Sequence, residues 1–197
     1  MSAQSGFALT LLTCLSSRYV LQAEIDTFGS VAKRQAAIST GPIGSAWAQN
    51  YTVASRVPLH PSSGTPFSDY TLSSASNALS HASLSFMHGG LSPEFVETHG
   101  TPYPSSINAL GASLLHRCRT RSPQPPPHPP APYAGLPPDS TPAEHSLYGS
   151  EGPLWYRGWA MDSERTVCSR VGDVMEKIGV RRLIMGHTPD FTVGRDV

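Results

Sequence analysis

Two short apolar runs, each delivering a histidine beside a glycine, constrain the fold of this 197-residue chain most. One covers residues 84–90 (LSFMHGG) and the other covers residues 183–189 (LIMGHTP). A short apolar run that stops at glycine is typical of a buried strand. In an α/β sheet, ligands bind beyond the carboxyl ends of the strands, so we expect His88 and His187 to meet at that edge. Two imidazoles placed there can bind one metal ion.

A histidine after a strand is more often a hydrogen-bonded structural residue than a ligand, so neither histidine is decisive alone. Four segments in a fixed order are more specific: residues 18–29, 86–90 (FMHGG), 152–158 (GPLWYRG) and 179–189 (GVRRLIMGHTP). Together they resemble the calcineurin-like metallophosphoesterases, in particular the Shewanella-like protein phosphatase branch.

The resemblance implies an α/β fold, a metallophosphoesterase-type β-sandwich flanked by helices. It also implies a centre of two divalent metal ions, manganese, iron or zinc, which holds a phosphate ester and activates a bridging water. His88 and His187 take the positions of two ligands of the second metal. Arg157 takes the position of an arginine that faces the substrate, and its planar guanidinium fits phosphate oxygens.

The chain also departs from the family pattern. The Gly-Asp-x-His, Gly-Asp-x-x-Asp-Arg-Gly and Gly-Asn-His-Glu blocks of the family do not occur in it. The first-metal ligands, the bridging aspartate and the acid that protonates the leaving group therefore have no counterpart. We interpret residues 1–197 as an incomplete phosphoesterase domain that supplies ligands for one metal at most, with no catalytic residue identified. Asp26 and Asp190 are interpreted as solvated surface acids.

Two classes of function follow from these observations. The first is a metal-dependent phosphoesterase similar to serine/threonine protein phosphatases, acting on a phosphorylated protein or a small phosphate ester. The second is a catalytically dead fragment or pseudoenzyme that binds a partner through a proline-rich segment. Residues 122–142 hold 10 of the 19 prolines, which favours extended polyproline geometry. This segment is either a solvated spacer or a ligand for an SH3-type or WW-type domain.

Charge and cysteine content indicate which partners and which cellular compartment to expect. The 14 basic and 14 acidic side chains leave no net field, which gives no indication of nucleic acid or an anionic membrane as partner. Cys14, Cys118 and Cys168 lack the close spacing of a disulfide framework or a zinc site, so we expect a reducing, cytoplasmic setting. The apolar stretch at residues 7–15 has no preceding Lys or Arg and is too short to span a membrane.

Hydrophobic spacing predicts the secondary structure of the matching segments. We expect helices over residues 22–39 with a break at Gly29, over 105–119, and over 166–179 with Ser163 as its cap, and strands over 51–54 and 181–185. Lys33 and Arg34 are expected on the solvated side of the first helix. The composition turns to Ser, Pro, Thr and Asn at about 58–80 and is proline-rich at about 120–145. We interpret both segments as disordered insertions, the first as a mobile loop or retained non-coding sequence.

Overall fold

A computed structural model describes residues 20–75, 77–120, 136–137 and 139–188 of the chain. The chain divides into two compact units. The first comprises Met1–Thr52 and Gly111–His145, and the second comprises Val53–Leu110 and Ser146–Val197. Within the described residues no helix is both long enough and apolar enough to cross a membrane.

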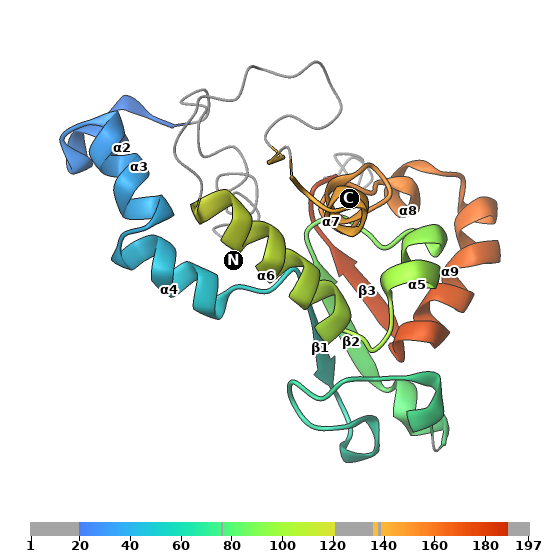
Figure 1. Cartoon of the computed structure of the whole chain (residues 1–197). Coiled ribbons are helices and arrows are strands. Elements are labelled where there is room, and N and C mark those ends of the chain that lie inside the picture. The colour runs from blue at the N-terminus through green and yellow to red at the C-terminus, as the bar shows by residue number, and fades with distance from the viewer. Residues whose placement is uncertain (1–19, 76, 121–135, 138, 189–197) are drawn as a thin grey trace, which may run out of the picture. The chain divides into compact units, whose positions relative to one another are not determined.

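The second unit is built on a three-stranded sheet in the order β1-β2-β3 (Figure 1). Strand β1 (Ala54–Pro58) pairs antiparallel with β2 (Ser83–Met87). Strand β2 in turn pairs parallel with β3 (Arg182–Met185), which places Met87 opposite Met185. The parallel pair makes the carboxyl ends of β2 and β3 neighbours at one edge of the sheet.

The two faces of this sheet differ in burial. Side chains alternate between faces along a strand, and Ala54, Ser85 and Met87 are buried on one face. On the other face Phe86 and Ile184, which are paired in register, are each 38% exposed. The second face therefore carries partly exposed apolar side chains.

Helices α5 (Pro93–His99), α8 (Gly158–Met161) and α9 (Glu164–Ile178) also belong to the second unit, and α9 lies against both α5 and α8. The Ser163 hydroxyl caps α9 by accepting a hydrogen bond from the Thr166 amide. Gly179 ends the helix with a positive φ of 64°. The buried side chains Val174 and Ile178 lie four residues apart, on one face of the helix. The predicted helix, its cap and its stop are confirmed.

The described part of the first unit includes α2 (Gln22–Phe28), α3 (Val31–Ser39) and α4 (Pro42–Asn50). Gly29 adopts a φ of 79° between α2 and α3, so the predicted break in this helical stretch is confirmed. The expected position of Arg34 on the solvated side is wrong. Its side chain is 7% exposed, because it forms an ion pair with Glu24 across that break.

In the segment expected to be a mobile insertion at about 58–80, the described residues form three short 3-10 turns, η2 (Pro61–Ser63), η3 (Leu72–Ser74) and η4 (Ala78–His81). Buried Arg56 holds it, since its guanidinium donates to the carbonyl oxygens of Ser63, Ser80 and Gly179. The same guanidinium lies 5.1 Å from the ring centre of Tyr70. The composition of the segment does not reveal these contacts, because the donors come from one cation on β1. Its interpretation as an insertion stays a prediction.

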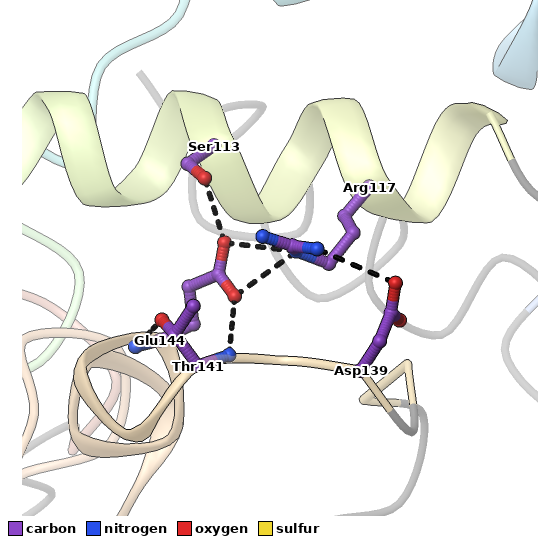
Figure 2. A network of polar contacts seen from close by, with 5 residues as sticks. All are labelled: Ser113, Arg117, Asp139, Thr141 and Glu144. Carbon is purple, nitrogen blue, oxygen red and sulfur yellow. Dashed lines mark hydrogen bonds and ion pairs between the residues drawn. The ribbon is translucent and has the colours of Figure 1, made fainter.

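Helix α6 (Ser105–Thr120) matches the helix predicted over residues 105–119, and α7 (Pro142–Tyr148) follows the proline-rich region. In the first unit, buried Glu144 accepts hydrogen bonds from Ser113, Arg117 and the Thr141 amide (Figure 2). Exposed Asp139 forms a second ion pair with Arg117. Burial opposes the charged carboxylate, but these hydrogen bonds outweigh it and lower the pKa of Glu144.

The chain is thus a mixed α/β protein, and that part of the predicted fold class is confirmed. The strand predicted over residues 51–54 is misplaced, because β1 begins only at Ala54. The complete metallophosphoesterase sandwich stays a prediction. Of the proline-rich segment, residues 121–135 and 138 lie outside the described residues, as do Cys14, the apolar stretch at residues 7–15 and Asp190.

Candidate functional site

The two predicted histidines lie side by side at the carboxyl edge of the parallel strand pair. His88 follows β2 directly, and His187 follows β3 after Gly186. The Gly186 amide donates to the His88 carbonyl oxygen at 3.0 Å, which extends the pairing past the strands. The imidazole centroids are 4.6 Å apart with the planes at 56°. The predicted meeting of His88 and His187 is confirmed, and their role as metal ligands stays a prediction.

The two glycines after His88 allow close packing that a side chain would prevent. A Cβ atom on Gly89 would lie 2.9 Å from the Pro153 carbonyl oxygen. A Cβ atom on Gly90 would lie 2.9 Å from ring carbons of Tyr156 and Trp159. The His-Gly-Gly sequence therefore brings residues 153–159 against the end of β2, which places Arg157 near the histidines.

His187 adopts a left-handed backbone conformation with a φ of 59°. Residues other than glycine rarely adopt it, and it costs on the order of 1–3 kcal/mol when the surrounding structure imposes it. Such strain gathers at functional sites, where it fixes the direction of a side chain. Here it accompanies the turn that follows β3 and brings the His187 ring next to that of His88.

Arg157 contacts this pair directly. Its Nη2 atom lies 2.8 Å from Nε2 of His187, and the Arg157 side chain is otherwise exposed. Arginine has no acceptor atoms, so the guanidinium donates and Nε2 of His187 accepts. The proton of the neutral His187 ring therefore lies on Nδ1. The structure brings all three predicted site residues together.

Trp155 is a further residue of this site, to which the sequence pattern assigns no role. Its ring stands edge to face against His187, with centroids 5.1 Å apart, and against Tyr148 at 5.7 Å. The nearby Trp159 donates instead to the Leu91 carbonyl oxygen at 2.9 Å. Trp155 and Trp159 each lie two residues from Arg157 in the sequence. This spacing indicates that a tryptophan could contact the site, but it does not tell which of the two lies next to His187.

Both imidazoles favour the neutral state. Burial lowers the pKa of His88, and the positive charge of Arg157 lowers it further. Burial also lowers the pKa of His187 to about 4, with smaller contributions from His88 and Arg157. Neutral imidazole is the form that binds metal ions, so at neutral pH both rings have the protonation state that a metal ligand needs.

The ring nitrogens of His88 support the same reading. Both are buried, and neither has a hydrogen-bond partner among the described residues. Buried polar atoms are seldom left unpaired, and an imidazole without a partner at a strand edge fits a metal ligand. The described part of the chain holds no cluster of three or more His, Cys, Asp or Glu side chains arranged for a metal. The described residues thus fit a metal ion through two imidazoles.

Comparison with known proteins adds one relative. An uncharacterized protein of Schizosaccharomyces pombe, C1840.07c, is 36% identical to the chain over 106 residues. These residues make up 54% of this chain and 26% of the relative, so the match spans about a quarter of the relative's length. No protein-family model and no solved structure matches the chain.

Proposed function

We propose that the second unit carries part of a phosphoesterase-type metal site, in which His88 and His187 bind one divalent transition-metal ion and Arg157 holds a phosphate. One observation carries this proposal. The two imidazole centroids lie 4.6 Å apart at the ends of neighbouring parallel strands, and both ring nitrogens of His88 are buried without a hydrogen-bond partner among the described residues. The sequence blocks similar to calcineurin-like metallophosphoesterases support the same class, a hydrolase of phosphate esters.

Each residue has a distinct task in this proposal. His88 and His187 offer neutral nitrogens of the type that manganese, iron and zinc accept. Arg157 offers paired donors to phosphate oxygens and keeps its charge at any physiological pH. Trp155 packs against the His187 ring in a T-shaped contact, and we propose that this contact helps to orient the imidazole. When bound, the ion would polarise a phosphoryl oxygen as a Lewis acid.

The exposure of Arg157 bears on the substrate class. Because its side chain reaches solvent, a phosphate group carried on a protein surface can approach it as readily as a small ester. The chain has no net charge to steer an anion from a distance. We therefore propose that the arginine attracts the phosphate locally.

We further propose that this chain by itself binds metal and phosphate without rapid turnover. A catalytic metal site uses about three protein ligands and an open position, and the cluster presents two imidazoles. The described contacts of the two histidines are with each other, with Arg157 and with Trp155, and they include no further acid that could protonate a leaving group. We therefore propose a function between the two classes: a domain related to the phosphoesterases that binds metal and phosphate as a binding protein does.

A cobalt titration tests the proposal. We expect wild-type protein to bind one Co²⁺ ion more tightly than the His88→Ala, His187→Ala double variant, with a visible spectrum that indicates nitrogen ligands. His60→Ala is the matched control, because His60 is an exposed histidine of the same unit that lies outside this cluster. Equal Co²⁺ affinity and stoichiometry for wild type and double variant would refute the proposed site.

A further inference from the structure

Arg157 and a metal ion require the same electron pair. The guanidinium Nη2 lies 2.8 Å from Nε2 of His187 and donates to it, so the lone pair of that nitrogen is already engaged. With the ring proton on Nδ1, Nε2 is the one nitrogen of neutral His187 that can bind a metal. An ion can therefore reach His187 through Nε2 only after Arg157 has moved away.

Charge acts in the same direction as this hydrogen bond. The guanidinium is always positive, and it lies next to the nitrogen where a divalent cation would bind. A bound tetrahedral dianion reverses both effects, because it offers Arg157 stronger acceptors than an imidazole and offsets the positive charge. The exposed side chain of Arg157 has room to turn toward such an anion.

The geometry points to Arg157 as a displaceable latch on His187, which holds the metal-binding nitrogen until an anion draws the guanidinium away. This inference rests on the proposed function and adds a regulation to it. Metal and phosphate then bind cooperatively, and Arg157 is the residue that couples them. By linkage, the metal raises the affinity for the anion by the same factor as the anion raises the affinity for the metal.

The test compares Co²⁺ binding by wild type, Arg157→Met and Arg157→Lys in chloride and in sulfate at equal ionic strength. Sulfate is a tetrahedral dianion that stays soluble with cobalt. Arg157→Met keeps an unbranched apolar stem but removes donors and charge, whereas Arg157→Lys keeps the charge without the fork. In chloride we expect Arg157→Met to bind Co²⁺ about tenfold or more tightly than wild type, since no charge-assisted hydrogen bond has to be broken.

Sulfate is expected to raise the Co²⁺ affinity of wild type and to leave that of Arg157→Met nearly unchanged, with Arg157→Lys between them. A second readout needs no metal: the nitrogen NMR signals of His187 should show the Nδ1–H form in wild type, with a shift of the Nε2 signal in Arg157→Met. Similar melting temperatures for the three proteins establish that the variants fold.

The outcomes separate the two ideas. If wild type binds Co²⁺ through the histidines but Arg157→Met binds no tighter, and sulfate affects both equally, the latch is overturned while the metal site stands. If neither protein binds Co²⁺ above the His88→Ala, His187→Ala background, the proposed metal site is overturned and the latch with it. An unchanged His187 nitrogen spectrum in Arg157→Met would also overturn the latch.

Discussion

The imidazole of His88 lies 4.6 Å from that of His187, although the two residues come from strands that are far apart in the sequence. Parallel pairing of β2 and β3 produces this relationship, because it places the carboxyl ends of both strands at one edge. The left-handed backbone of His187 and the two glycines after His88 complete it.

The first prediction concerns activity. With added manganese, the purified chain should hydrolyse a generic aryl phosphate no faster than the His88→Ala, His187→Ala double variant. One ion held by two imidazoles can polarise a phosphoryl oxygen but lacks the partners that activate water and clamp the leaving group, a loss of several kcal/mol of transition-state stabilisation. Steady-state rates of both proteins decide the matter, and metal-dependent turnover well above the double variant would contradict the prediction.

The second prediction concerns pH. The pKa of His187 is about 4 in the folded protein and about 6.5 in the unfolded chain. Between about pH 6.5 and pH 4 the His187 imidazole is protonated in the unfolded chain but stays neutral in the folded protein. The free energy of unfolding therefore decreases as the pH falls through this range. Urea unfolding at several pH values should show a smaller loss for the double histidine variant. An NMR titration of His187 with a midpoint near 6.5 would refute the burial argument.

The third prediction concerns the glycines. Gly89→Ala should destabilise the fold by about 1–3 kcal/mol, because the new Cβ atom meets the rigid Pro153 carbonyl and the backbone must shift. Gly172→Ala is the control, since Gly172 lies on α9 with nothing within 4 Å of the added atom. This control should stabilise the protein by about 0.5–1 kcal/mol. Denaturant unfolding measures both changes, and equal signs would contradict the packing argument.

The fourth prediction concerns Glu144 in the first unit. Glu144→Ala should cost about 1–3 kcal/mol, because it removes a buried acceptor of hydrogen bonds from Ser113, Arg117 and Thr141 (Figure 2). Asp139→Ala removes the exposed partner of Arg117 and should cost less than about 1 kcal/mol. Because the folded pKa of Glu144 is lowered, its contribution is present above the unfolded value of about 4.3 and is lost as the pH falls below it. Thermal unfolding of the two variants at pH 7 and pH 3.5 checks both size and sign.

The fifth prediction concerns the uncovered face of the sheet. Phe86 and Ile184 are paired and 38% exposed, so we expect the isolated chain to associate and to dissolve poorly. Replacing both with threonine should reduce association, because threonine suits a strand and is polar. Leu59→Thr, at an exposed position beyond β1, should change it less. Light scattering after gel filtration measures the association of the wild type and of the two variants. A monodisperse wild type would contradict the expected association.

The amino-acid sequence alone determined the elements whose causes are local. The apolar stripe of α9 with its Ser163 cap and Gly179 stop, the break at Gly29, and the placement of His88 and His187 after short apolar strands all follow from neighbouring residues. Such features depend on hydrogen bonds and periodicities that span a few positions, so a reader of the sequence can predict them.

Only the tertiary structure decided which side chains meet. Three contacts join residues from separate elements: the ion pair of buried Arg34 with Glu24, the hydrogen bonds from Arg56 to Ser63 and Ser80, and the hydrogen bond from Arg157 to His187. The packing of strands and loops decides which partners these side chains find. The sequence alone does not show whether a charged side chain is solvated or hydrogen-bonded to a buried acceptor. The sequence placed the histidines at strand ends, and the parallel pairing of β2 and β3 made them neighbours within reach of an arginine.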